Sequence, residues 1–248
     1  MPILEGKAVT KYFGGLAAVS NVDFSVEQGE AVGLIGPNGA GKTTLFNLIS
    51  AALTPKSGTI WFKGENITGL KPYKICRMGV ARTFQTVKIF PDLPALSNVL
   101  IGLHFGISAR TSSTEKVRKA SEYLDFAGLS KVRMTPARDL TLAAQKNLEV
   151  ARALATEPEL LLLDEIMAGL NPTEVAGAMD LVGRIRDKGI TIIMIEHVMK
   201  AIMNVCDRIM VLHQGEKIAE GTPREITTSE RVIKIYLGDK ARAGSSRD

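Results

Sequence analysis

One short segment constrains the fold of this chain more than any other. Residues 36–43 read Gly-Pro-Asn-Gly-Ala-Gly-Lys-Thr and match the pattern G-x-x-x-x-G-K-[ST] at every fixed position. The apolar run 31–35 before it is typical of a strand buried on both faces, and the residues from near Gly41 to Leu53 predict a helix. A strand, a glycine-rich loop and a helix in this order predict a phosphate-binding loop within an α/β fold.

The chemistry of this loop follows from its residue types. Glycines let the backbone approach a phosphate closely, and the start of the helix adds a partial positive charge. We expect Lys42 to reach the β- and γ-phosphates of a bound nucleotide, and the hydroxyl of Thr43 to ligate Mg²⁺. The residues expected to bind the nucleotide through the loop are Gly36, Pro37, Asn38, Gly39, Ala40, Gly41, Lys42, Thr43 and Thr44.

A pair of carboxylates supplies the second element of a nucleotide site. Asp164 and Glu165 come directly after the apolar run 160–163, which predicts another buried strand. We expect Asp164 to hold Mg²⁺ through water, and Glu165 to polarise the attacking water as a general base. Together with the loop, the pair predicts an enzyme that hydrolyses a nucleoside triphosphate.

The composition of the chain argues against several classes of partner and site. The 248 residues include 31 Lys and Arg against 26 Asp and Glu, a net charge of +5. Surfaces that bind nucleic acid carry dense clusters of basic residues. A net charge this small, spread along the chain, therefore predicts no nucleic-acid partner. The two cysteines, Cys76 and Cys206, are too few and too far apart for a disulfide framework or a cysteine-rich zinc site. No apolar run approaches the roughly 18 residues that cross a bilayer.

Helical patterns occupy the middle of the chain. A helix capped by Thr114 and a second helix over Gln145–Thr156 are predicted there. The first of them has a predicted apolar face of Val117, Ala120, Leu124 and Ala127. Afterwards, Asn171 caps a further predicted helix and Gln214-Gly215 predicts a hairpin turn.

These patterns predict a domain organisation. We expect a single domain over residues 1–238 and a flexible tail over 239–248. The domain has a core of 1–85 and 159–238, with a helical subdomain inserted at about 86–158.

Four further features point to one family. Phe13 follows Lys11-Tyr12, Gln85 ends Arg82-Thr83-Phe84-Gln85, and His197 follows the apolar run 190–195. Asp139-Leu140-Thr141 leads into a helical stretch directly before the carboxylate pair. Together with the loop, these features resemble the ATP-binding cassette (ABC) transporter ATPases over about residues 3 to 238. The resemblance implies a RecA-like P-loop NTPase core, an N-terminal antiparallel β subdomain and the inserted α-helical subdomain.

The resemblance also implies roles for single residues. Phe13 stacks on adenine, and Gln85 ligates Mg²⁺, senses the attacking water and links the helical subdomain to a membrane partner. His197 contacts the γ-phosphate as a switch residue. The segment 169–171 crosses a dimer interface.

The same resemblance implies partners and a location. The partners are a second ABC ATPase subunit, in a homodimer or a heterodimer, integral membrane permease subunits and, indirectly, a periplasmic substrate-binding protein. A permease helix would dock near residues 84–90, Leu93 and Leu96. The chain would be peripheral, on the cytoplasmic face of the inner membrane.

Within the family, the chain is most similar to the ATPases of branched-chain amino acid importers. The segments that carry this likeness are residues 11–19, 79–85, 96–102, 168–172 and 235–238. An importer ATPase is therefore the expected function. Alternatives are an ATP-gated dimerising clamp that hydrolyses weakly, or an ABC ATPase that serves another substrate or a role outside transport.

Three positions depart from the family pattern. The family signature is usually L-S-G-G-Q. In this chain Leu140 is followed at these positions by Thr141, Leu142, Ala143 and Ala144, and an alternative alignment places Gln145 at the last position. Ile166 replaces a usual proline, and Asn171 replaces a common aspartate. Side chains in place of both glycines hinder close approach of the backbone to a phosphate bound on the opposite subunit. We therefore expect the composite site completed by this chain's signature to be the weaker one.

Overall fold

The computed structural model describes residues 2–107 and 111–235, and the predicted tail lies outside them. The chain divides into two compact units. The first unit consists of Met1–Gly69 and Ile195–Asp248, and the second of Leu70–Met194. Each unit is described by itself.

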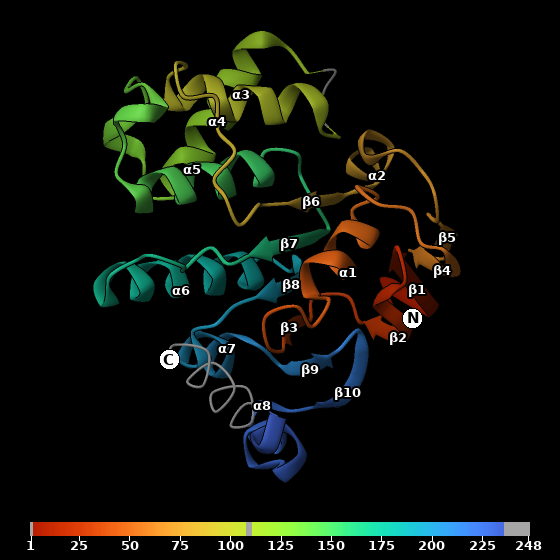
Figure 1. Cartoon of the computed structure of the whole chain (residues 1–248). Helices are drawn as coiled ribbons and strands as arrows, with labels where there is room; N and C mark the ends of the chain where they lie inside the picture. Colours follow the sequence, from red (N-terminus) through yellow and green to blue (C-terminus); the bar gives the residue numbers. More distant parts are fainter. Residues whose placement is uncertain (1, 108–110, 236–248) are drawn as a thin grey trace. The chain divides into compact units, whose positions relative to one another are not determined.

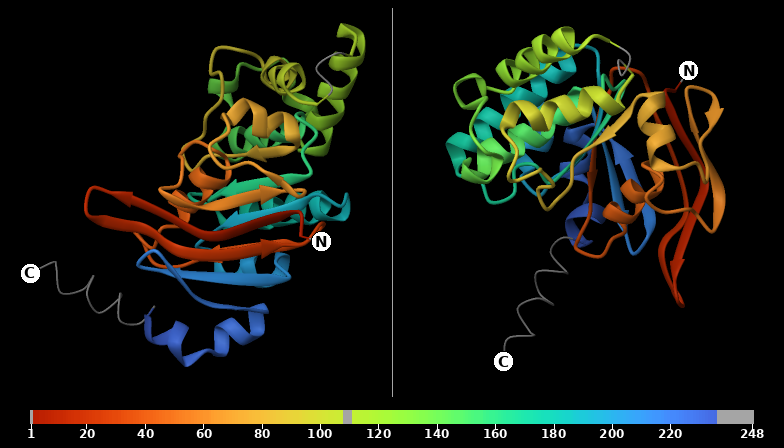
Figure 2. Two further views of the ribbon diagram at one scale, coloured as in Figure 1. Left: turned by 90° about the vertical axis from the view of Figure 1, so that its right-hand side faces the viewer. Right: turned by 90° about the horizontal axis from the view of Figure 1, so that it is seen from above.

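An antiparallel sheet forms the N-terminal part of the first unit (Figures 1 and 2). Its strands, in the order β2-β1-β4-β5, are β2 (Leu16–Val26), β1 (Leu4–Phe13), β4 (Ser57–Phe62) and β5 (Glu65–Asn66). Leu4 pairs with Val26 on one side and with Phe62 on the other. Alternate residues of β2 are buried near its end, which fits a strand with one face in the core. The antiparallel β subdomain is confirmed.

The second group of strands in this unit carries the phosphate loop. All five residues of β3 (Ala31–Ile35) are buried, and β3 pairs in parallel with β9 (Arg208–His213). The antiparallel partner of β9 is β10 (Glu216–Gly221). Between them Gln214 and Gly215 have φ of 48° and 84°, so the predicted hairpin turn is confirmed.

The helices of this unit include α1 (Lys42–Ile49), α7 (Met199–Val205) and α8 (Pro223–Thr228), and residues 230–235 are helical as well. The prediction that the helix after the loop runs to Leu53 is wrong. Ala51 takes a φ of 54°, a left-handed conformation that ends a helix, and the N–H of Leu53 turns back to the carbonyl of Asn47.

In the second unit, β6 (Val80–Arg82) pairs in parallel with β7 (Leu160–Asp164), and β7 neighbours β8 (Thr191–Ile195). Every residue of β7 and β8 is buried, as the apolar runs predict. Two helices flank these strands in sequence, α2 (Pro72–Met78) and α6 (Pro172–Asp187). The Asn171 cap is confirmed, since its side chain and that of Glu174 form a reciprocal capping box.

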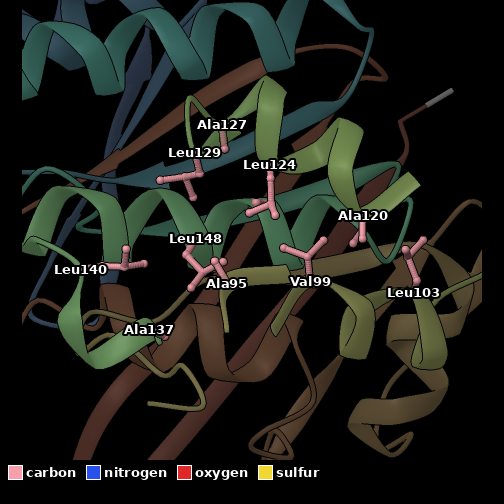
Figure 3. Packing of buried hydrophobic residues seen from close by; sticks show 12 residues of the cluster. Ala95, Val99, Leu103, Ala120, Leu124, Ala127, Leu129, Ala137, Leu140 and Leu148 are labelled. Carbon is pink, nitrogen blue, oxygen red and sulfur yellow. The ribbon is translucent and has the colours of Figure 1, made fainter. Parts of the chain in front are cut away.

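The remaining helices of this unit pack around one apolar cluster (Figure 3). They are α3 (Ala95–Phe105), α4 (Ser113–Phe126) and α5 (Leu142–Leu154), with the 3₁₀ turns η1 (Ser130–Val132) and η2 (Ala137–Asp139). Val99, Leu124 and Leu148 lie in the cluster, one from each helix. Burying such a side chain contributes about 1.5–3 kcal/mol, so the cluster is what holds the three helices together.

Three details of these helices differ from the prediction. Ser112, not Thr114, caps α4, because its hydroxyl accepts a hydrogen bond from the N–H of Glu115. Thr141 caps α5, which therefore starts before Gln145. Val117 is exposed, although its spacing placed it on the apolar face. None of the helices within residues 2–107 and 111–235 combines the length and the apolar character needed to cross a membrane.

Candidate nucleotide site

The phosphate loop joins β3 to α1 in the first unit, and two of its glycines are sterically required. Gly36 has a φ of 153°, and a Cβ there would lie 2.1 Å from the carbonyl oxygen of Leu212. Gly41 has a φ of 102°, and its Cβ would lie 2.2 Å from the carbonyl oxygen of Ala18. The loop can therefore fold in this way only with glycine at both positions.

Lys42 lies inside the loop. Its side chain is 6% exposed, and its ammonium donates hydrogen bonds to the carbonyl oxygens of Gly36 at 2.6 Å and Pro37 at 3.0 Å. No acidic residue occupies the first turn of α1, so the partial positive charge of the helix start is not neutralised locally. A buried ammonium next to a helix start is suited to bind an anion such as a phosphate.

The other loop residues differ in exposure. Asn38, Gly39 and Thr43 are exposed, Pro37 and Thr44 are half-buried, and Ala40 is buried. The carbonyl of Ala40 accepts a hydrogen bond from the N–H of Gly215 at 3.0 Å. The turn between β9 and β10 thus supports the loop, a role that the hairpin pattern gave no sign of.

Phe13 ends β1 in the same unit. Its ring is 50% exposed, and the ammonium of Lys11 lies 5.8 Å from the ring centre. The Lys11 ammonium also donates to the carbonyl of Thr54 at 2.8 Å, which anchors it beside the ring. An exposed aromatic face is available for stacking.

Asp164 ends β7 in the second unit and is buried. Its Oδ2 accepts a hydrogen bond from Nη2 of Arg82 at 2.8 Å. The hydroxyl of Thr83 accepts from the N–H of Asp164 at 3.1 Å. This ion pair joins β6 to β7, and the local sequence pattern around Arg82 does not predict it.

Glu165 and Gln85 meet in the second unit. Nε2 of Gln85 donates to Oε2 of Glu165 at 2.9 Å. Glu165 is half-buried and has a φ of 50°, a conformation that is rare for residues other than glycine. Such strained backbone occurs often at functional sites, and here it aims the carboxylate toward Gln85.

His197 follows β8 and belongs to the first unit, where it is exposed, whereas Glu196 beside it is buried. The structure therefore brings Gln85, Asp164 and Glu165 together within the second unit. Lys42, Phe13 and His197 lie in the first unit.

The signature segment begins α5. The hydroxyl of Thr141 accepts from the N–H of Ala144 at 3.3 Å and keeps its own proton for another acceptor. Leu142 is 46% exposed, and Ala143 and Ala144 are half-buried. The amide of Gln145 donates to the carbonyls of Ala137 and Leu140 at 3.2 and 3.1 Å, so it is used within its own subunit.

Exposed apolar side chains follow Gln85. Phe84, Phe90 and Leu93 are each more than one third exposed, whereas Leu96 packs against the apolar cluster of the helices. Buried Asn98 holds this stretch, because it accepts from the N–H of Phe90 at 2.8 Å and donates to the carbonyl of Phe90 at 3.0 Å. The exposed side chains therefore stand on a well-anchored loop.

Comparisons with known proteins decide the family. The sequence profile of ABC transporters matches residues 19–168, which is more than half of the chain. This protein belongs to the ABC transporter family. A second profile, described as branched-chain amino acid ATP-binding cassette transporter, matches residues 216–242 of the ABC cassette. The cassette is accordingly an ATPase of the kind that powers transport.

Relatives in sequence cover almost the whole cassette. It is 40% identical over 251 aligned positions to the high-affinity branched-chain amino acid transport ATP-binding protein BraF of Pseudomonas aeruginosa (strain PAO1), covering 96% of this chain and 98% of that protein. The corresponding protein LivG of Escherichia coli (strain K12) is also 40% identical, with the same coverage. A probable LivG of Archaeoglobus fulgidus is 33% identical and covers 96% of each chain.

Solved structures agree with this family and with the P-loop NTPase fold. A nucleotide-free ATP-binding cassette from an ABC transporter superposes with a TM-score of 0.85 at 32% identity, covering 95% of this chain and 99% of the other. A cassette in its ADP conformation gives 0.86 at 32% identity, covering 96% and 99%. A dimeric cassette in a post-hydrolysis state, bound to ADP and Pi, gives 0.81 at 28% identity, covering 89% and 99%.

Proposed function

We propose that this cassette hydrolyses ATP to drive the import of branched-chain amino acids. The proposed substrate class rests on the relatives BraF and LivG, which are named as high-affinity branched-chain amino acid transport ATP-binding proteins. The hydrogen bond between Gln85 and Glu165 is the main structural support for the hydrolysis mechanism. It places the side chain proposed to sense the attacking water next to the carboxylate proposed as the base, both in the second unit.

The predicted residues divide the steps of ATP hydrolysis among them in this proposal. The Lys42 ammonium and the loop N–H groups bind the phosphates, and Phe13 stacks on the adenine. Glu165 accepts the proton of the attacking water, which Gln85 helps to orient. His197 contacts the γ-phosphate and reports whether it is present.

Magnesium fits the donor set of the chain. The hydroxyl of Thr43, the amide oxygen of Gln85 and the carboxylate of Asp164 are hard oxygen donors, the type that Mg²⁺ prefers. Nε2 of Gln85 donates to Glu165, so its amide oxygen is the atom that remains for a cation. Within residues 2–107 and 111–235, no three His, Cys, Asp or Glu gather as a metal site. When bound, the cation would neutralise charge on the substrate phosphates.

The cassette works in an assembly in this proposal. A second ABC ATPase subunit, identical or different, faces the signature segment and the segment 169–171. Permease subunits dock on the exposed Phe84, Phe90 and Leu93, and a periplasmic binding protein delivers the amino acid to them. The cassette then lies peripherally on the cytoplasmic face of the inner membrane, as a single domain over residues 1–238.

The signature favours an asymmetric pair of ATP sites. Leu142 projects an exposed side chain where the family pattern has glycine, and its Cδ2 lies 3.3 Å from a Cβ built on Gly169. The apolar side chain therefore lies beside the proposed dimer segment and hinders a phosphate approaching this signature. The second candidate function, an ATP-gated clamp that hydrolyses weakly, is favoured by this observation and by Ile166 in place of the usual proline.

The test is transport in a defined system. The full-length chain is co-purified with its membrane partners, reconstituted in liposomes and assayed for ATP-dependent uptake of labelled leucine, isoleucine and valine, with histidine and glutamate as comparisons. Preferential uptake of the three branched-chain amino acids is expected. Equal uptake of all five, or none that requires ATP, would contradict the proposed substrate.

A further inference from the structure

One face of α5 is charged although it is buried. Lys146 is 5% exposed and Glu149 is 2% exposed, and Arg152 follows after the same spacing. Residues three apart are neighbours on a helix surface, so the three side chains form one row. A buried charge is unfavourable unless it is paired or hydrogen-bonded. The partners of this row therefore indicate its purpose.

Lys146 binds the turn that carries Glu165. Its ammonium donates to the backbone carbonyl of Glu165 at 3.0 Å and to that of Ala168 at 2.7 Å. The N–H of Ala168 also donates to the carbonyl of Glu165, at 3.2 Å. One ammonium thus holds both ends of the turn in which Glu165 has its left-handed backbone conformation. This grip stabilises a conformation that a glutamate rarely adopts.

Glu149 and Arg152 bind the segment that carries Gln85. Oε1 of Glu149 accepts from the N–H of Lys88 at 3.0 Å. Arg152 donates to the carbonyl of the same Lys88, and its guanidinium lies 3.7 Å from the Glu149 carboxylate. Both backbone groups of Lys88, three residues after Gln85, are therefore held by α5.

A single helix accordingly fixes both segments whose side chains meet at the Gln85–Glu165 hydrogen bond. We propose that Lys146 is a positioning residue for Glu165: it acts through two backbone carbonyls to aim the carboxylate, while Glu149 and Arg152 keep Gln85 opposite it. The inference rests on the proposed function, in which Glu165 is the base. Because α5 binds both segments, a displacement of the Lys88 segment would move α5 and, with it, the turn that carries Glu165.

The test compares lysine variants in the complex that co-purifies with the full-length chain. Lys146→Met keeps most of the apolar stem and removes the ammonium. It is expected to lower kcat for ATP hydrolysis about 10- to 100-fold with KM unchanged, because a small misplacement of a reacting group has effects of this size. Lys146→Arg should recover most of the lost kcat, since a guanidinium can also donate to two carbonyls.

Lys116→Met is the matched control. Lys116 is another buried lysine of the second unit, 7% exposed, with its ammonium 3.2 Å from Nδ1 of His104. Its loss should leave kcat per nucleotide-binding protein at the wild-type value, even if the Tm falls. Rates are divided by the fraction that binds a fluorescent ATP analogue, so that misfolded protein does not count.

Glu165→Gln separates failure of the proposed function, in which Glu165 is the base, from failure of the positioning role of Lys146. If it keeps the wild-type rate, Glu165 is not the base and the proposed function fails first. If it loses the rate, three results overturn the positioning role of Lys146: a wild-type kcat in Lys146→Met, a change in KM alone, or no recovery in Lys146→Arg.

Discussion

Nε2 of Gln85 lies 2.9 Å from Oε2 of Glu165, although the two residues are far apart in the sequence. Gln85 stands on the exposed stretch after β6, next to Phe84 and Phe90, which the proposed permease would touch. A movement of that stretch therefore changes the surroundings of the proposed base directly. This hydrogen bond offers a short physical link between docking and hydrolysis.

Gln85→Ala should lower kcat about tenfold or more, because the orientation of a base and its water contributes on that scale. The affinity for ATP should stay within about twofold of the wild-type value, since Gln85 supplies only one of the proposed ligands of the cation. Single-turnover hydrolysis and equilibrium titration with an ATP analogue measure the two quantities. Gln28→Ala, on an exposed loop of the first unit, is the control. Loss of binding equal to the loss of rate would speak against an orienting role.

Lys42→Met should weaken ATP binding about 10- to 100-fold, because a hydrogen bond to a charged group contributes about 1.5–3 kcal/mol. The variant keeps a stem that fills the loop but loses the hydrogen bonds of the ammonium to the carbonyls of Gly36 and Pro37, so its Tm is measured beside its affinity. Lys56→Met, an exposed lysine of the same unit, should bind ATP like the wild type. Titration of both variants with a fluorescent ATP analogue gives the comparison, and equal affinities would refute the role of Lys42.

Gly41→Ala and Gly39→Ala form a matched pair that tests the loop geometry. Both glycines have positive φ, but a Cβ at Gly41 meets the carbonyl of Ala18 at 2.2 Å, whereas a Cβ at Gly39 meets nothing within 4 Å. Gly39→Ala should cost about 1–2 kcal/mol of backbone strain alone. Gly41→Ala should lower the Tm clearly further, as measured by thermal unfolding. Equal Tm values would mean that the loop relaxes freely.

Glu149 should make stability depend on pH. Burial raises its pKa above the usual 4.5, against the opposing hydrogen bonds from the N–H groups of Lys88 and Phe84 and the charges of Arg152 and Lys146. Between the unfolded and the folded pKa the folded state binds more protons, so the free energy of unfolding falls as pH rises through this window. Glu149→Gln removes that titration. Tm measured at steps upward from pH 4.5 should therefore fall more in the wild type than in the variant, and parallel curves would contradict this.

The altered signature predicts unequal sites in a heterodimer. This chain's own Lys42, Asp164 and Glu165 would be completed by the partner's signature, and the partner's site by Thr141 and Leu142. Glu165→Gln should therefore reduce ATPase activity more than the matching substitution in the partner ATPase. Steady-state rates of the two mutant complexes measure this, and equal losses would count against asymmetry.

Local patterns predicted the elements that depend on neighbouring residues. The glycine-rich loop, the buried strand before Asp164, the Asn171 cap and the Gln214-Gly215 turn are all short-range features, because turns and caps are set by a few adjacent residues. Val117 was misplaced for a related reason. Helical periodicity marks an apolar face but does not show how much of that face a neighbouring helix covers.

Local sequence patterns do not predict polar contacts between residues that are distant in the sequence. In sequence, Lys146, Glu149 and Arg152 resemble the solvated side of an amphipathic helix. Lys146 and Glu149 are buried and Arg152 is half-buried, because two distant segments, at Lys88 and at residues 165–168, pack their backbone groups against them. The ion pair of Arg82 with Asp164 was missed for the same reason, since its partners come from neighbouring strands.

The central claim is that Glu165 is the base for ATP hydrolysis in an assembled transporter. The most direct measurement is ATPase activity of the co-purified complex carrying Glu165→Gln, beside Glu122→Gln on the exposed surface of α4. Glu165→Gln is expected to lower kcat about 10²- to 10⁴-fold while ATP still binds, and Glu122→Gln is expected to match the wild type. A Glu165→Gln complex that hydrolyses ATP at the wild-type rate would show that Glu165 is not the base.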